Sequence, residues 1–375
     1  MDRKTFIISA KRSAVAPTGG ALRNVAVDVL AGKLIQETIV AAKIPKEKVE
    51  DLILSNALAG GGNIARLSVL RAGLPNTIVG TTIDRQCVGG LDAIIQAHKR
   101  IQTRQEDCLV AGGAESYSLR PQRHYTPAWQ GERMALERPP FYVGDDPKLP
   151  IGHRVMELKK SYGISDQQEY DWAKESHRKT LNNRKQLAQE IYSFSSPTEH
   201  DAFARKLDGE MFQKSRGKFG QLHPCNTAPN ADAAAFTTLV SEDFLQHHPQ
   251  AHYLELIDSF TLAGDPKEFP LLPVKAIAQL FKKHKLSWKS IAQFELMEAF
   301  AVQALLCVHL SKAPKAIVNP YGGALAMGHP IGASGSILMT RLFYGLKNKD
   351  DLGLAVIAGA GGLASIALVK CHRYH

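Results

Sequence analysis

The feature that most constrains the fold is an order of elements that occurs twice along the 375-residue chain. In the first half, a β-branched segment at 79–83 leads to Cys87 and two glycines, and an amphipathic stretch and an apolar strand follow. In the second half, a strand and a helix lead to a glycine-rich turn around His329, and a further helix and two apolar strands follow. The order strand, turn, helix, strand predicts βαβ units with parallel strands. Two such halves, each with a reactive residue at a turn, indicate an internal duplication.

The segment between the two halves differs in character. From 117 to 222 prolines, arginines and histidines are frequent and no regular strand is predicted, although 166–182 has the pattern of a polar helix. The alanine-rich stretch at 226–239 predicts a tightly packed helix. We therefore predict an N-terminal half at 1–116, an inserted loop domain at 117–222, a return to the N-terminal half at 223–252, and a C-terminal half at 253–375.

Composition argues against several classes of protein. No run of about 18 apolar residues occurs, so no membrane-spanning helix is expected, and the first ten residues lack the apolar segment of a signal peptide. The net charge is +10, but lysines and arginines are spread along the chain, which disfavours nucleic acid as a partner. Such a charge is compatible with a phosphate-bearing small molecule, or with solubility alone. Five widely spaced cysteines without a C-x-x-C pair predict no disulfide framework, no metal site and a reduced, cytoplasmic compartment.

Cys87 and His329 are the residues best placed for chemistry. Cys87 stands between a predicted strand and the first turn of a predicted helix, where backbone N–H groups and the helix dipole favour a thiolate. A buried structural cysteine is the competing interpretation. His329 follows Gly328 and precedes Pro330, which restrict its orientation and let it face a thiolate or a carbonyl oxygen. A loop histidine with only structural hydrogen bonds is the alternative for that position.

Several segments of the chain resemble motifs of the thiolase superfamily, and they occur in the family's order. The stretch around Cys87 resembles the nucleophile motif, and the stretch around His329 resembles the Gly-His-Pro signature. Others resemble the strand-end motif after the nucleophile, the segment with a serine that contacts coenzyme A, and the Asn-Glu-Ala-Phe motif. The matching segments are 82–94, 111–116, 257–266, 298–301 and 319–335. Together they extend over nearly the whole chain.

The resemblance implies a fold and a chemistry. The fold is a five-layered α/β/α/β/α body of two βαβαβ halves with an inserted loop domain. In the chemistry, Cys87 takes an acyl group from an acyl-CoA with the help of His329, and Ser259 and Gly328 contribute to the coenzyme A site. Coenzyme A and acyl-CoA are then substrates in lipid metabolism, with no covalently bound cofactor and no metal. The family also implies a homodimer or homotetramer, with neither nucleic acid nor membrane as a partner.

Two departures from the family pattern bear on the chemistry. The best gapless register puts Ala358 where the family has a second reactive cysteine, and a shift by two would put Val356 there. Met297 replaces the asparagine that helps to hold a water in an oxyanion hole. Neither side chain can take a proton from the carbon next to a thioester, and losing such a group commonly costs about 10² to 10⁴ in rate. Cys225 and His223 are possible substitutes, although a structural loop is the simpler interpretation of that segment.

Three functional classes therefore stay open. The first is a thiolase that makes or breaks β-ketoacyl-CoA. The second is an acyltransferase that needs no second cysteine, and either passes the acyl group to another nucleophile or condenses it with a decarboxylating donor. The third is a non-catalytic homologue that binds acyl-CoA. Acylation of Cys87 separates the first two from the third, and thiolysis of acetoacetyl-CoA separates the first from the second.

Overall fold

The computed structural model describes residues 3–126, 131–136, 138–146, 151–194, 199–210 and 225–373. Within these residues, the main strands pair in the order β11-β12-β13-β10-β1-β9-β5-β3-β4, with short β2 and β8 beside β9 and β1. The strands are β1 (Thr5–Ser13), β2 (Ala16–Pro17), β3 (Asp51–Ser55), β4 (Thr81–Ile83), β5 (Cys108–Glu115), β8 (Ile191–Tyr192), β9 (Ala231–Ser241), β10 (His252–Ala263), β11 (Ile291–Leu296), β12 (Leu352–Gly359) and β13 (Leu363–Arg373). The sheet thus takes strands from both predicted halves of the chain.

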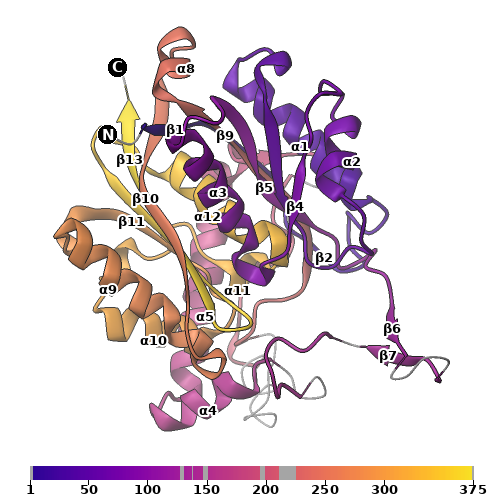
Figure 1. Ribbon diagram of the computed structural model, residues 1–375. Helices are drawn as coiled ribbons and strands as arrows, with labels where there is room; N and C mark the ends of the chain where they lie inside the picture. The colour runs from indigo at the N-terminus through magenta and orange to yellow at the C-terminus, as the bar shows by residue number, and fades with distance from the viewer. Residues whose placement is uncertain are drawn as a thin grey trace.

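Helices cover this sheet on both sides and fill the space between its two halves (Figure 1). They are α1 (Val27–Ala42), α2 (Ile64–Arg71), α3 (Gly89–Gln102), α4 (His153–Ser161), α5 (Asp166–Asn182), α6 (Arg184–Ala188), α8 (Glu242–His247), α9 (Leu272–His284), α10 (Ala301–Ser311), α11 (Ala324–Met327) and α12 (Ile331–Gly345). Three short 3₁₀ helices matter for the site: η2 (Gln86–Val88), η3 (Pro266–Leu271) and η5 (Lys315–Ile317).

Three apolar cores define five layers. One core packs α1 and α2 against the N-terminal strands, and another packs α9 and α10 against β11, β12 and β13. The largest core surrounds α3 and α12 and takes residues from both half-sheets. The half-sheets join where β1 meets β10, at the pairs Phe6–Glu255 and Ile7–Leu254. The architecture is therefore α/β/α/β/α, as the resemblance implied.

The parallel strands predicted near Cys87 are present. β3 runs parallel to both β4 and β5, so the carboxyl ends of these three strands lie at one edge of the sheet. Cys87 follows β4 at this edge, and Asn56 and Glu115 stand at the ends of β3 and β5. Loops at the carboxyl ends of parallel strands are where α/β proteins commonly place their sites.

The expected helix at 226–239 is wrong, because this segment contains β9. β9 lies between β1 and β5 and is buried along its whole length. Ala231, Ala233 and Ala235 pack against Ala333 and Ile337 of α12, where only small side chains leave room for the helix. Alanine favours a helix in isolation, but two strand neighbours and a helix crossing the face override that preference here.

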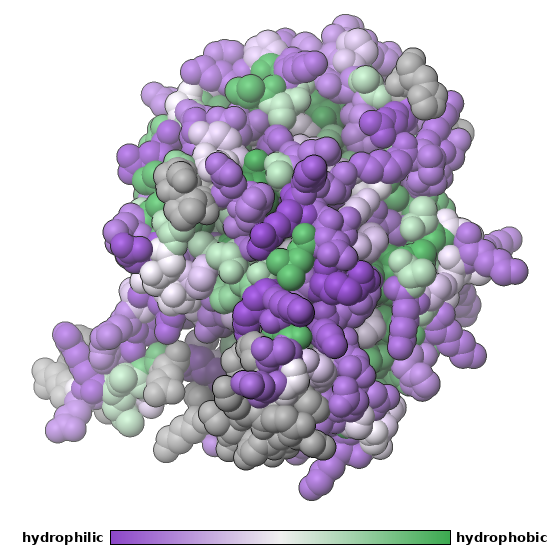
Figure 2. Space-filling view, turned by 180° about the vertical axis from the view of Figure 1, so that it is seen from behind, coloured by the Kyte–Doolittle hydropathy of each residue, from purple (hydrophilic) through white to green (hydrophobic). Residues whose placement is uncertain are grey.

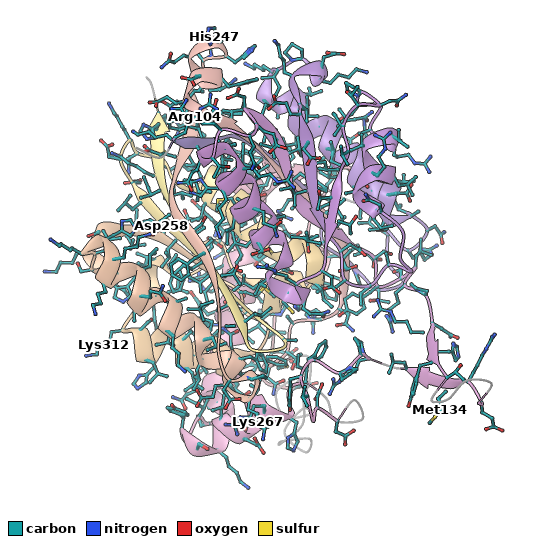
Figure 3. All side chains as sticks on the ribbon, in the orientation of Figure 1. Arg104, Met134, His247, Asp258, Lys267 and Lys312 are labelled. Atoms are coloured by element: carbon teal, nitrogen blue, oxygen red, sulfur yellow. The ribbon has the colours of Figure 1, made fainter. Side chains whose placement is uncertain are left out.

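The expectation that 117–222 lacks regular strands is also wrong. β6 (Arg123–Tyr125) and β7 (Met134–Leu136) form an antiparallel hairpin that extends away from the body, with Met134 at its outer part (Figure 3). β8 pairs in parallel with the end of β1 and so joins the inserted segment to the main sheet. The predicted polar helix is α5, which begins after a capping box formed by Ser165 and Gln168.

Among the residues that the structure describes, none of the helices has both the length and the apolar character to cross a bilayer. Within the same ranges, no group of three or more His, Cys, Asp and Glu side chains is arranged to hold a metal ion. The face seen in Figure 2 is mainly polar, with hydrophobic residues in small separate groups.

Candidate active site

Cys87 lies at a sharp turn between β4 and α3. It is the middle residue of η2, and Gln86 before it has a φ of 50°, a left-handed conformation that is uncommon outside glycine. Backbone strain of this kind is often found at functional sites. Cys87 keeps part of its surface exposed, whereas the other four cysteines are buried. The turn therefore presents one thiol at the sheet edge.

His329 reaches this thiol from the other half of the chain. Its Nε2 lies 3.2 Å from Sγ of Cys87, a separation of 242 residues in sequence. Its backbone N–H donates to the carbonyl of Pro229 at 2.8 Å, and Gly328 before it has a φ of 106°. The structure thus brings together the two residues that the sequence identifies as candidates for catalysis, one from each half.

Ser334, which the sequence analysis missed, orients the imidazole. Its hydroxyl lies 2.7 Å from Nδ1 of His329 and donates to the carbonyl of Pro330 at 3.3 Å. The tautomer that suits a hydroxyl donating to that carbonyl has its proton on Nδ1, donated to Ser334, and presents Nε2 to Cys87 as an acceptor. Ser334 stands in the first turns of α12, five residues after the histidine. The only sign of this contact in the sequence is a serine five residues after the histidine.

The protonation of the pair differs from the sequence expectation of a thiolate. Desolvation of the sulfur raises the pKa of Cys87 to about 11, although the backbone N–H groups of Ala360 and of Cys87 itself lower it. Desolvation lowers the pKa of His329 to about 4. Burial therefore favours the uncharged forms of both groups, a neutral thiol and a neutral imidazole.

Those two backbone N–H groups are a second feature of the site. They face Sγ of Cys87 from its own residue and from Ala360, just beyond the end of β12. Donors fixed at a sulfur are also within reach of the carbonyl oxygen of a thioester formed on it. The turn after β12 thus places a backbone donor at the sulfur without using a side chain.

Glu115 connects the loops at the sheet edge. Its buried carboxylate accepts from Nδ2 of Asn56 at 2.7 Å, and from the N–H groups of Ala57, Leu58 and Gly332 at 3.0 to 3.1 Å. Desolvation raises its pKa to about 7, despite these donors. It therefore ties the loops after β3 and β5 to the start of α12, and with it to the loop of His329.

The surroundings of Cys87 on the C-terminal side are apolar. Met297 is 2% exposed and belongs to the same core against which Cys87 packs. Ala358 is 7% exposed and packs in the neighbouring cluster with Phe269 and Phe300. Ala299 packs against both clusters, so the two clusters adjoin each other. No side chain able to act as an acid or base stands at either position.

One of the two possible substitutes, Cys225, lies beside the inserted segment. Cys225 is buried and lies near enough to Tyr170 of α5 to influence the pKa of that phenol. Among the described residues, the side chain that lies within hydrogen-bonding distance of Sγ of Cys87 is His329. His223 lies outside the described residues.

A buried carboxylate, Glu298, supports the loop before His329. Its oxygens accept from Nε1 of Trp172 at 3.1 Å, from Oγ of Ser176 at 2.8 Å and from Nδ2 of Asn319 at 2.8 Å. Ser176 also accepts from the N–H of Gly323 at 2.9 Å. Glu298 therefore joins α5 of the inserted segment to the glycine-rich loop.

The two residues expected to bind coenzyme A, Ser259 and Gly328, are both buried. Ser259 lies within β10 opposite Ala367 and is 6% exposed, and its hydroxyl makes no hydrogen bond with the described residues. A Cβ at Gly328 would lie 2.8 Å from the ring of Phe203 and 3.0 Å from Ala231. Neither residue lines the cavity beside Ala360, and their role in binding coenzyme A stays a prediction.

A cavity of about 440 Å³ leads to the turn after β12. It is lined by Phe141 and Phe269 among others, and it ends at Ala360 and Gly361. Lys267, at the lower edge of the molecule in Figure 3, stands at its rim. The cavity is also lined by two arginines, so that with Lys267 it has three basic side chains, and by three carboxylates that balance them: Arg138, Arg154, Asp145, Asp146 and Glu157. The cavity therefore approaches the donor that faces Cys87, and its rim has no excess of positive charge.

The fold and the paired thiol and imidazole define an enzyme of the acyltransferase class. Comparison with known families matches residues 5–243 to the thiolase N-terminal domain and residues 251–371 to the thiolase C-terminal domain. The chain therefore belongs to the thiolase family.

Relatives and solved structures agree with this assignment. The chain is 32% identical over 382 residues to "Putative acetyl-CoA C-acetyltransferase VraB" of Staphylococcus aureus strain MRSA252, covering 97% of this chain and 98% of that one. It is 34% identical over 371 residues to "Putative acetyl-CoA C-acetyltransferase YhfS" of Bacillus subtilis strain 168, with the same coverage. The structure of Acat5 thiolase from Ascaris suum in complex with coenzyme A has a TM-score of 0.89 at 28% identity, covering 98% of this chain and 99% of that one. The Bacillus anthracis acetyl-CoA acetyltransferase has a TM-score of 0.88 at 25% identity, covering 99% of both chains.

Proposed function

We propose that the protein transfers acyl groups from acyl-CoA thioesters through an acyl-enzyme on Cys87. The observation that carries the proposal is the 3.2 Å contact between Nε2 of His329 and Sγ of Cys87. A neutral imidazole held with its lone pair toward a neutral thiol is arranged to take the proton as the sulfur attacks. The names of the relatives and membership of the thiolase family support the same class of reaction.

The first half-reaction follows from the contacts of the site. Sγ of Cys87 attacks the thioester carbonyl while Nε2 of His329 takes the thiol proton. The N–H groups of Ala360 and Cys87 stabilise the negative charge on the carbonyl oxygen. When the tetrahedral intermediate collapses, the C–S bond to coenzyme A breaks and the departing thiolate takes the proton from His329. The second half-reaction is the reverse, with coenzyme A or another nucleophile as acceptor.

We propose that this protein differs from a complete thiolase in the step that passes the acyl group to an acceptor. Cleavage or formation of a β-ketoacyl-CoA passes through an enolate, which needs a proton donor or acceptor beside the carbon atom. Ala358 and Met297 provide apolar surface at the two expected positions. We therefore propose that transfer between thioesters, or to another non-carbon nucleophile, is the favoured reaction, and that carbon–carbon bond chemistry is slow.

The cavity beside Ala360 is the proposed entry for the thioester arm of coenzyme A. Its aromatic lining suits an apolar chain, and its inner end reaches the donor that faces Cys87. Coenzyme A is present in the structure of the Ascaris suum thiolase. Because the rim charges are balanced, we expect only a weak dependence of acyl-CoA binding on salt.

Location and assembly are also part of the proposal. We infer a cytoplasmic protein that forms a homodimer or homotetramer. β4 stands at the end of the sheet order, and Val79 just before it is 70% exposed. An unpaired edge strand beside exposed apolar residues is a common site of association. Light scattering after size exclusion would test this, and a monomer at micromolar concentration would contradict it.

An isotope exchange experiment tests the acyl-enzyme without assuming an acceptor. Acetyl-CoA is incubated with isotopically labelled coenzyme A, and transfer of the label into acetyl-CoA is followed by mass spectrometry. We expect exchange with the wild type and with Cys307→Ala, which removes a fully buried thiol elsewhere, and none with Cys87→Ala. Absence of exchange in the wild type across several acyl-CoAs would refute the proposal and favour a binding role. In parallel, deuterium from D₂O should enter the acetyl methyl group only slowly.

A further inference from the structure

Arg341 is a fully buried charge that the proposed mechanism does not use. It lies in α12, ten residues after the first residue of that helix, and its side chain is 0% exposed. A guanidinium is rarely buried unless its donors have specific partners. The partners of Arg341 therefore indicate what it does.

Two of these partners lie in the loop that leads to His329. Nη2 donates to the carbonyl of Gly322 at 3.0 Å, and Nη1 lies 3.0 Å from Sδ of Met327. The guanidinium also stands 5.7 Å from the ring centre of Tyr321. These contacts are at the start and end of the segment 321–327, and His329 follows two residues later.

The other side of this loop is held by the inserted segment. A Cβ at Gly322 would lie 2.0 Å from Oγ1 of Thr180, and a Cβ at Gly323 would lie 2.3 Å from the carboxylate of Glu298. The glycine-rich loop is therefore enclosed between α5 with Glu298 on one side and Arg341 on the other. Removing Arg341 would free one side only, because the Glu298 contacts would remain.

The charge of Arg341 is balanced through a buried network. Its Nε lies 3.7 Å from Oε1 of Glu190 and 4.0 Å from Oε2 of Glu295. Glu190 also pairs with Nε of Arg12 at 2.8 Å, and Arg12 pairs with Asp201 at 2.7 Å. Arg12 is equally buried, and its side-chain hydrogen bonds go to Glu190, Asp201 and the carbonyl of Ser13. The chain thus contains a matched charge that shares the network and whose side-chain hydrogen bonds lie outside the loop.

We propose that Arg341 is a positioning residue that fixes the loop 321–327, and so holds the imidazole of His329 at Cys87. This rests on the proposed function, because it assumes that His329 acts as the proton acceptor. The planar guanidinium reaches a carbonyl and a thioether at once, which a lysine ammonium on one flexible stem does not reproduce.

The test compares acetyl-CoA/coenzyme A exchange in Arg341→Met, Arg341→Lys, Arg12→Met and His329→Gln. We expect Arg341→Met to lower kcat at least tenfold with KM for acetyl-CoA unchanged, and Arg341→Lys to recover part of the loss. Arg12→Met should stay within about twofold for the folded fraction, even if its thermal stability falls further. If Arg341→Met does not fold, Arg341→Lys carries the comparison, and a rate equal to the wild type would overturn the proposal.

A pH profile separates positioning from loss of folded protein. The groups beside His329 are the Cys87 thiol and the Ser334 hydroxyl, and the charges of Glu115 and Asp84 and the phenol of Tyr117 act on Cys87. The groups that act on Arg341 are Glu190, Glu295, Asp201 and the phenol of Tyr321. Burial keeps the pKa of His329 near 4, so wild-type kcat should be flat from pH 8 to about 5.5. If Arg341→Met lets the imidazole meet water, kcat should fall below about pH 6.5. An unchanged profile with a rate like Arg12→Met would refute positioning, whereas a normal rate in His329→Gln would refute the proposed function itself.

Discussion

Replacing Ala358 by cysteine should increase the cleavage of acetoacetyl-CoA. Ala358 lies in β12 two residues before Ala360, whose N–H faces Cys87, and it shares the neighbour Ala299 with the core around the thiol. A thiol at this position would stand beside the reacting carbon and could protonate the departing enolate. The added sulfur atom would enter a site that is 7% exposed and packed against Phe269 and Phe300. We expect this to cost about 1 kcal/mol of stability.

The gain in rate can be bounded. A positioned acid or base commonly contributes about 10² to 10⁴, which corresponds to about 3 to 5 kcal/mol of barrier. Met297→Asn should add to this more than additively, since both groups act on one transition state. That second change also removes a buried apolar side chain and leaves an amide in an apolar core, at a cost of about 3 kcal/mol. The single variant Ala358→Cys is therefore the cleaner comparison.

The assay is steady-state thiolysis of acetoacetyl-CoA by the wild type, Ala358→Cys and the double variant, each corrected for the folded fraction. We expect weak turnover in the wild type and an increase of at least tenfold with the new thiol. Ala42→Cys, at a fully buried alanine of α1 in the core of the N-terminal strands, is a matched control that should leave the rate unchanged. Brisk wild-type turnover that needs Cys87 but ignores Ala358→Cys would show that another group supplies the proton.

Three further results are expected. Iodoacetamide should label Cys87 before the fully buried Cys108 and Cys307. Because the pKa of Cys87 is raised to about 11, its labelling rate should rise about tenfold per pH unit from pH 7 to 9. A labelling rate that stays constant across this range would indicate a thiolate–imidazolium pair instead. Ser334→Ala should slow acyl exchange about tenfold by freeing Nδ1 of His329, while Thr340→Ala on the same helix should not; equal rates in both would remove Ser334 from the account. Gly328→Ala should lower the free energy of unfolding by about 1 to 3 kcal/mol in urea titrations, because its φ of 106° and the ring of Phe203 oppose a side chain; Gly209→Ala, with no neighbouring atom within 4 Å, should have little effect.

The sequence predicts the part of the fold that depends on local pattern. Period and end signals predict α5 at its observed bounds, and the short strand at 51–55 lies where apolar residues cluster. The same local patterns gave a wrong prediction at 226–239, because the alanines there are the small side chains that let α12 pack across β9. The β6–β7 hairpin was missed because its two strands of three residues have no clear alternation of polar and apolar residues.

The residues of the candidate site also fall into those that the sequence predicts and those that it does not. Cys87 and His329 are visible in the sequence because glycines and a proline surround them, and the fold is needed only to bring them together. Ser334, Glu115 and Arg341 are not visible, since each acts through contacts between distant segments. The raised pKa of the thiol could not be predicted either, because the sequence indicates a helix N-terminus but not the burial of the sulfur.

The most direct test of the central claim is the mass of the intact protein after brief incubation with a panel of acyl-CoAs and an acid quench. An acyl-enzyme on Cys87 predicts that the wild-type mass increases by one acyl group for at least one thioester. The adduct should be absent from Cys87→Ala, reduced in His329→Gln and removed by added coenzyme A. No adduct with any acyl-CoA, or an adduct that persists in Cys87→Ala, would contradict acyl transfer through this residue.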